Sequence, residues 1–276
     1  METVPRELKN VGVVGAGRMG APIIGHLVRK KFATQAFDLD AARAETVRRL
    51  GAVWAANPES LAAQCDAILV CVGFDSEVRE LLSQGGPLRK ARRGAVIAIL
   101  STVHPKTVQE LARETEAAGL RVVDSTVCRG GEAADNGTLL SFVGGDGETV
   151  DRLTPVLRAY SSDVVHTGGV GTAQVAKAVN NLILWACLVA DHEGLALARR
   201  YGADVETLRR ALLLSSCANG PLEKWGTQTM AWAEDDMAIV AEMAAEAGIT
   251  LPQADVNREV CRALKPRRYK LDLYGR

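Results

Sequence analysis

A lysine and two asparagines share one face of a predicted helix, a combination suited to proton transfer. Lys177, Asn180 and Asn181 are spaced i, i+3 and i+4, so their side chains project from the same side. An amine can take the proton of a hydroxyl group, and an ammonium can return it to a developing alkoxide. The chain becomes very apolar over residues 182–190, and lysine is rarely buried without a partner. We therefore predict Lys177 as a general acid and base; the alternative is a lysine whose amine reaches water along an apolar surface.

A glycine-rich segment near the N-terminus has the spacing of a dinucleotide-binding loop. Gly15, Gly17 and Gly20 follow the apolar residues 11–14 and precede a helical pattern. In this fingerprint the first glycine makes a tight turn, the second lets a pyrophosphate approach, and the third lets helix and strand pack closely. The free amides at the start of the helix offer an anion site. A loop whose glycines serve only the turn is the alternative.

An acidic residue at the end of the second predicted strand indicates which dinucleotide binds. Asp38 lies 18 residues after Gly20, close to the ~20 expected of a carboxylate that accepts hydrogen bonds from ribose hydroxyls. Because a carboxylate repels a 2′-phosphate, we predict NAD as the cofactor. Arg43 could compensate for that repulsion, which keeps NADP as the alternative.

Four segments resemble, in the same order, the β-hydroxyacid dehydrogenase family, which includes 3-hydroxyisobutyrate and 6-phosphogluconate dehydrogenases. They are the glycine loop with Met19, residues 101–105 (STVHP), residues 124–131 (DSTVCRGG) followed by 137–139, and residues 171–181 (GTAQVAKAVNN). The resemblance implies an NAD(P)-dependent oxidoreductase. It would move a hydride between nicotinamide and a small β-hydroxy acid, or a related alcohol or carbonyl, with Lys177 as the general acid and base.

The resemblance also assigns the remaining site residues. Lys177 and Asn181 are the expected catalytic residues, and Cys128, Arg129, Gly130 and Gly131 are expected to bind the substrate. The expected cofactor-binding residues are Gly15, Ala16, Gly17, Arg18, Met19, Gly20, Asp38, Val72 and Thr102.

Three positions, in two segments, depart from the family pattern. Cys128, Arg129 and Gly130 stand where many relatives carry Ser-Gly-Gly, so a weakly donating thiol replaces a hydroxyl. Arg129 brings a fork of donors that suits a carboxylate, sulfonate or phosphonate, and we predict that it holds the substrate's acid group unless it is a surface side chain. Asp235 stands at a family lysine position; it would favour an amino group on the substrate, or it is simply a first-turn helix residue.

The order of predicted elements indicates two domains. Up to residue 166, short β-rich runs alternate with helical patterns, which predicts an α/β, Rossmann-type doubly wound parallel sheet that binds the dinucleotide. From residue 167 to 276 only helical patterns follow, which predicts an all-helical substrate and oligomerisation domain. The expected active site is the cleft where residues 168–171 join the two domains.

Composition narrows the partners. Among 276 residues, 33 Lys and Arg balance 33 Asp and Glu, which argues against a nucleic-acid partner. The longest apolar run, residues 182–190, is shorter than the ~20 residues of a membrane span, and no signal peptide is visible, so we expect a cytoplasmic protein without a membrane partner. Cysteine and histidine spacing predicts no metal site. Residues 182–190 are apolar all round, which predicts burial against a second copy in a homodimer or homotetramer.

Two other functions stay open. Imine reductases share the expected architecture but usually place another residue at the position of Lys177. A catalytically silent dinucleotide-binding module, acting as a sensor or scaffold, would not need Lys177 and Asn181, and both are present here.

Overall fold

Parallel strands form the centre of the first part of the chain. The computed structural model describes residues 7–227, 230 and 232–264. Six parallel strands lie in the order β3-β2-β1-β4-β5-β6, the order of a Rossmann sheet. They are β1 (Asn10–Val14), β2 (Ala33–Phe37), β3 (Val53–Trp54), β4 (Ala67–Val70), β5 (Val96–Ile99) and β6 (Arg121–Asp124). The sheet is extended by β8 (Leu139–Gly144), antiparallel to β6 and to β7 (Val127–Cys128), and by β9 (Ser161–Gly168), parallel to β8.

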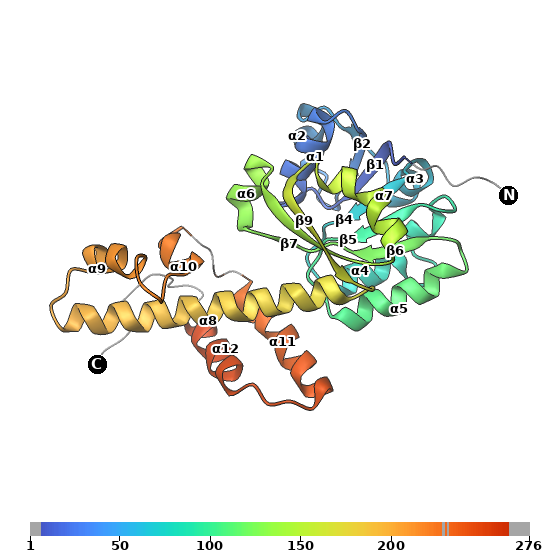
Figure 1. The fold of residues 1–276 in the computed structure, drawn as a ribbon. Helices are drawn as coiled ribbons and strands as arrows, with labels where there is room; N and C mark the ends of the chain where they lie inside the picture. The colour runs from blue at the N-terminus through green and yellow to red at the C-terminus, as the bar shows by residue number, and fades with distance from the viewer. Residues whose placement is uncertain (1–6, 228–229, 231, 265–276) are drawn as a thin grey trace. The chain divides into compact units, whose positions relative to one another are not determined.

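Helices cover both faces of this sheet (Figure 1). Along β4, Ala67 and Leu69 belong to one buried cluster, and the intervening Ile68 and Val70 belong to another. The first cluster packs under α1 (Gly20–Arg29), α2 (Arg43–Arg49), α6 (Gly130–Asn136) and α7 (Gly147–Leu157). The second packs under α3 (Pro58–Gln64), α4 (Asp75–Leu82), the 3₁₀ turn η1 (Pro87–Lys90) and α5 (Pro105–Glu116). Burial on both faces explains the continuous apolar runs of the central strands and confirms the predicted doubly wound fold.

The carboxyl ends of the parallel strands meet at one edge of the sheet. The glycine loop follows β1, Asp38 follows β2, Val72 follows β4 and Thr102 follows β5. In open α/β sheets, ligands bind outside this edge, where the strand order reverses. Here the reversal lies between β1 and β4, so the glycine loop stands at the expected place.

The chain packs as two compact units, Met1–Lys177 and Ala178–Arg276. The division falls inside the long helix α8 (Thr172–Arg200), later in the chain than residue 166. The domain boundary predicted after residue 166 stays a prediction. Within the described residues the second unit holds only helices: the rest of α8, α9 (Val205–Leu212), α10 (Gly220–Glu223), α11 (Ala233–Ala247) and α12 (Pro252–Leu264). α11 and α12 lie side by side (Figure 1), and they share a buried cluster with Trp185 and Leu188 of α8.

Helix α8 is unusually apolar. By length and composition alone it is long and apolar enough to cross a membrane, a test that core helices of soluble proteins also pass. In this structure 39% of its most apolar stretch is buried inside the protein. The absence of a membrane partner therefore stays a prediction.

Candidate active site

The three glycines of the loop after β1 meet three different steric demands. Gly15 has φ +98°, and a Cβ added there would collide with the backbone carbonyl of Cys71. A Cβ added at Gly20 would collide with the carbonyl of Gly15. A Cβ at Gly17, by contrast, would meet no atom within 4 Å. The first and third glycines are thus required by the protein's own packing, and the second borders open space that suits a pyrophosphate.

Asp38 connects the end of β2 to the glycine loop. Its Oδ2 accepts a hydrogen bond from the amide of Ala16 at 2.7 Å, and its Oδ1 accepts one from the amide of Asp40 at 2.9 Å. Each carboxylate oxygen can accept a further bond, as a ribose hydroxyl would require. Arg43 forms an ion pair with Asp40, with Nε and Oδ2 3.3 Å apart. The arginine that could offset a 2′-phosphate therefore already has a carboxylate partner.

Arg18 links the glycine loop to the substrate segment predicted from the sequence. Its two terminal nitrogens donate to the two carboxylate oxygens of Asp135 in α6, at 2.8 and 2.7 Å. This hydrogen bond lowers the pKa of Asp135 below its ordinary value. The guanidinium also lies against Gly131, where any side chain would contact it. Arg18 thus joins two predicted site segments, and its contact with the cofactor stays a prediction.

Ser101 ties together the ends of β4 and β5. Its hydroxyl accepts a hydrogen bond from the amide of Val72 at 3.0 Å and donates one to the carbonyl of Val72 at 2.8 Å. Val72 and Thr102, both predicted to contact the cofactor, therefore lie on neighbouring loops. Met19 is half-buried against the cluster under α1.

Lys177 is half-buried, and its amine contacts the predicted substrate segment. Nζ donates a hydrogen bond to the carbonyl of Val127 at 2.8 Å and lies 3.9 Å from Sγ of Cys128. Cys128 itself is buried, with 5% of its surface exposed. Two predicted site residues, 49 positions apart in sequence, are therefore in contact.

Arg129 has a partner that the sequence did not indicate. One terminal nitrogen donates to Oδ2 of Asp163 at 2.7 Å, to Oγ of Ser162 at 2.8 Å and to the carbonyl of Thr138 at 3.1 Å. The hydrogen bond from Arg129 lowers the pKa of Asp163. A substrate acid group would have to use the other guanidinium nitrogens, so the predicted role of Arg129 gains no support from these contacts and stays a prediction.

The backbone of the same segment is unusual. Arg129 adopts φ +84°, a left-handed conformation that costs a side-chain-bearing residue about 1–2 kcal/mol. The following residue, Gly130, has φ +77°, and a Cβ there would meet no atom within 4 Å. A glycine at position 129 would adopt this turn without strain.

Asn181 and Asp235 belong to the second unit. Asn181 lies one helical turn beyond Lys177 on α8, is buried, and accepts a hydrogen bond from Nδ2 of Asn180 at 3.0 Å. Asp235 is exposed in the first turn of α11 beside Glu234 and Asp236, where negative charge suits the helix dipole. Its predicted effect on substrate choice stays a prediction.

Asp124 is a buried residue whose role the sequence did not reveal. It is fully buried at the end of β6, with Oδ1 accepting from the amide of Gly171 at 2.7 Å and Oδ2 from the amide of Gln174 at 2.9 Å. Burial raises the pKa of Asp124, and these backbone hydrogen bonds oppose that rise. The carboxylate thereby caps the first turn of α8, in which Gln174 lies three residues before Lys177. The sequence signal for a role of Asp124 was its position as the first residue of the DSTVCRGG motif.

Comparison with known proteins agrees with this geometry. Residues 10–169 match the family described as the NAD binding domain of 6-phosphogluconate dehydrogenase. Residues 171–272 match the family described as the NAD-binding domain of NADP-dependent 3-hydroxyisobutyrate dehydrogenase. Together with the Rossmann sheet and the glycine loop, these matches define an NAD(P)-dependent oxidoreductase.

Individual relatives indicate which kind of NAD(P)-dependent oxidoreductase this chain is similar to. The 2-(hydroxymethyl)glutarate dehydrogenase of Eubacterium barkeri is 28% identical over 262 residues, 91% of this chain and 87% of that protein. The mitochondrial 3-hydroxyisobutyrate dehydrogenase of Mus musculus is 30% identical over 207 residues, 75% of this chain and 62% of that protein. The solved 3-hydroxyisobutyrate dehydrogenase of Mycobacterium tuberculosis with L-serine has a TM-score of 0.86 at 22% identity, over 95% of both chains. The chain belongs to the β-hydroxyacid dehydrogenase family and is an NAD(P)-dependent dehydrogenase acting on hydroxyl groups.

Among the described ranges 7–227, 230 and 232–264, no three His, Cys, Asp or Glu side chains lie close enough together to hold a metal ion.

Proposed function

We propose that this protein oxidises a small β-hydroxy carboxylate, or reduces the matching carbonyl, with Lys177 as the general acid and base. The observation that carries the proposal is the contact of the Lys177 amine with Val127 and Cys128. An ammonium has three N–H donors, so one can bond the Val127 carbonyl while the others reach a substrate oxygen. This arrangement suits a group that exchanges a proton with the reacting hydroxyl.

The chemistry divides between the cofactor and the protein. Nicotinamide, when bound, supplies the hydride acceptor or donor. In oxidation, Lys177 takes the proton of the substrate hydroxyl as the carbon loses its hydride; in reduction, its ammonium returns the proton to the developing alkoxide. Asn181, one turn further along α8, would donate a hydrogen bond to the same substrate oxygen.

The substrate class follows from chemistry that the two named relatives have in common. 3-Hydroxyisobutyrate and 2-(hydroxymethyl)glutarate both carry a hydroxymethyl group on the carbon next to a carboxylate. In this chain, the backbone amides of Gly130 and Gly131 and the remaining donors of Arg129 would hold that carboxylate. Cys128 would contribute only a weak donor there.

NAD is the proposed cofactor in preference to NADP. The carboxylate of Asp38 is anchored by two backbone amides at the end of β2, and Arg43 is paired with Asp40. A fixed negative charge at this position favours ribose hydroxyls and opposes a 2′-phosphate.

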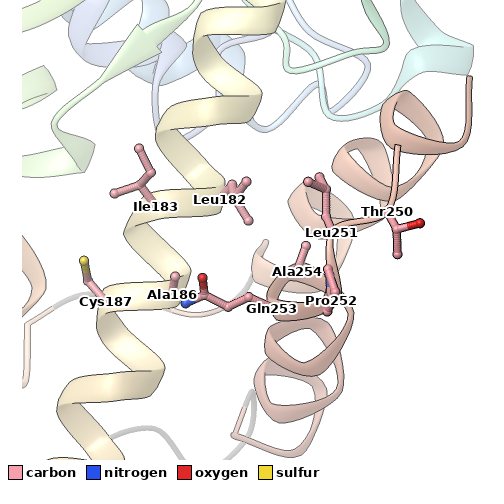
Figure 2. Close-up of a pocket in the computed structure, with 9 residues that line it drawn as sticks. All are labelled: Leu182, Ile183, Ala186, Cys187, Thr250, Leu251, Pro252, Gln253 and Ala254. Carbon is pink, nitrogen blue, oxygen red and sulfur yellow. The ribbon is translucent and has the colours of Figure 1, made fainter. Parts of the chain in front are cut away.

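A second copy of the chain is the proposed partner of the second unit. One face of α8 exposes Val179, Ile183 and Leu197, with exposed fractions of 49%, 58% and 61%, and Tyr201, just after the end of the helix, is 86% exposed. Beside this face lies a cavity of about 430 Å³ between α8 and the start of α12, lined mainly by apolar side chains. Figure 2 shows Leu182 and Leu251 facing each other across it. Exposed apolar area of this kind is typical of subunit interfaces, and Ile183→Glu is expected to shift the purified protein from dimer or tetramer to monomer in light scattering.

A substrate panel tests the proposed function. We would follow nicotinamide absorbance at 340 nm with NAD and NADP against 3-hydroxyisobutyrate, 2-(hydroxymethyl)glutarate, L-serine, a sulfonated alcohol and a cyclic imine. The proposal expects turnover of at least one β-hydroxy carboxylate, with NAD preferred. Turnover of the imine alone would support an imine reductase. Dinucleotide binding without turnover of any compound would support a silent binding module.

A further inference from the structure

A buried glutamine joins the loop after β5 to the first turn of α8. Gln174 has 1% of its surface exposed, and both ends of its side-chain amide are hydrogen-bonded. Oε1 accepts from the amide of Val103 at 3.0 Å, and Nε2 donates to the carbonyl of Ser101 at 2.8 Å. The hydrogen bonds of this amide to Ser101 and Val103 therefore lie on either side of Thr102, a residue predicted to bind the cofactor.

The same turn of α8 is fixed from a second direction. The backbone amide of Gln174 donates to the buried carboxylate of Asp124, and the carbonyl of Ala173 accepts a hydrogen bond from Oγ1 of Thr126 at 3.0 Å. Asp124 and Thr126 flank the end of β6, just ahead of Val127, whose carbonyl accepts from Lys177. The start of α8 is therefore held by the ends of two neighbouring strands, β5 and β6.

Spacing along α8 connects this glutamine to the amine. Gln174 and Lys177 are i and i+3, so their side chains leave the same face of the helix. A shift of the turn relative to residues 101–103 would change the distance between the Lys177 amine and any group held by the Thr102 loop. Proton and hydride transfer need the amine and the cofactor placed accurately, because a misplacement of about 1 Å can lower the rate about a hundredfold.

We propose that Gln174 is a positioning residue: its side-chain amide fixes the Thr102 loop and the Lys177 turn in one register. This inference rests on the proposed role of Lys177. It assigns Gln174 no contact with the substrate, because its side-chain amide bonds to Ser101 and Val103. Gln174 therefore acts on the reaction through Lys177.

The test replaces Gln174 with Met, which fills a similar volume without either hydrogen bond. The matched control is Gln109→Met, because Gln109 donates to the carbonyl of Val170 at 3.1 Å, in the same approach to α8, without an observed hydrogen bond to residues 101–103. We expect Gln174→Met to lower kcat at least tenfold and to raise the primary deuterium isotope effect on kcat. NADH affinity should stay within threefold of wild type. Gln109→Met should keep kcat within threefold.

A double variant separates positioning from a general structural role. If Gln174 acts through Lys177, adding Gln174→Met to Lys177→Ala should lower the remaining rate less than twofold. An equal loss in both backgrounds would overturn the inference, as would a kcat of Gln174→Met within twofold of wild type. Full turnover by Lys177→Ala would instead overturn the proposed function.

Gln174→Glu provides a second route if the Met variant does not fold. It keeps an acceptor for the Val103 amide but places an oxygen where the Ser101 carbonyl needs a donor. We expect the same pattern, lower kcat with NADH affinity retained, and an unchanged kcat would refute the inference.

Discussion

Substitution of single glycines in the loop after β1 separates the needs of the fold from those of the cofactor. At Gly17 an added Cβ meets no protein atom within 4 Å, and the backbone is not left-handed. Gly17→Ala should therefore leave the fold intact, with a gain of up to about 1 kcal/mol because the unfolded chain loses freedom. At Gly20 the same methyl group collides with the carbonyl of Gly15, so Gly20→Ala should cost about 1–3 kcal/mol of stability or prevent folding.

For dinucleotide binding, by contrast, Gly17→Ala should be harmful. A methyl group placed where a pyrophosphate approaches should cost binding about 1–3 kcal/mol, by analogy with overpacking in cores. At about 1.4 kcal/mol per tenfold change, this corresponds to roughly 5- to 150-fold weaker dinucleotide binding. Urea unfolding measures the first effect and NADH fluorescence titration the second. A Gly17→Ala variant that binds NADH within twofold of wild type would refute the placement of the pyrophosphate.

Three further predictions concern single residues. The free energy of unfolding of Arg129→Gly, measured in urea, should exceed that of Arg129→Ala by about 1 kcal/mol, because both variants lose the guanidinium but only alanine keeps the left-handed strain. An unchanged substrate KM in Arg129→Lys and Arg129→Ala would exclude the acid-binding role. Asp38→Asn should raise the ratio of kcat/KM with NADP to that with NAD at least tenfold, and an unchanged ratio would remove Asp38 from cofactor choice. Burial lowers the pKa of His192, so as pH falls the imidazole takes up a proton in the unfolded chain before it does so in the folded protein. The contribution of His192 to the free energy of unfolding is therefore complete above the unfolded pKa of about 6.5. It is lost as pH falls towards the pKa of the folded protein, by up to about 1.4 kcal/mol per pH unit. His192→Gln should flatten the dependence of the unfolding free energy on pH below about 6.5. An unchanged slope would mean that other groups cause this pH dependence.

The sequence predicted the parts of the fold that have strong local patterns. The strands around residues 67–72 and 96–100 are continuous apolar runs, and α8 is a long stretch without proline, so both were predictable. Helix α3 is only seven residues long and shows little helical periodicity, so its sequence signals are the Asn57 cap and Pro58 at its start. Strand β3, only two residues long, depends on pairing with β2.

The candidate site was predictable only where a motif carried it. The glycine loop and Lys177 lie in motifs with fixed spacing, and their placement needed no tertiary contact. Asp163, the partner of Arg129, lies 34 residues away on β9, and no local pattern connects the two. Gln174 likewise meets residues more than 70 positions earlier in the chain. Such contacts arise from the topology of the sheet, which local sequence does not specify.

Amine rescue of Lys177→Ala tests the central claim most directly. The account predicts that this variant binds NADH with wild-type affinity, loses turnover by several orders of magnitude, and regains at least tenfold when a small primary amine such as ethylamine fills the space left by the side chain. Wild-type turnover by Lys177→Ala, without added amine, would contradict it.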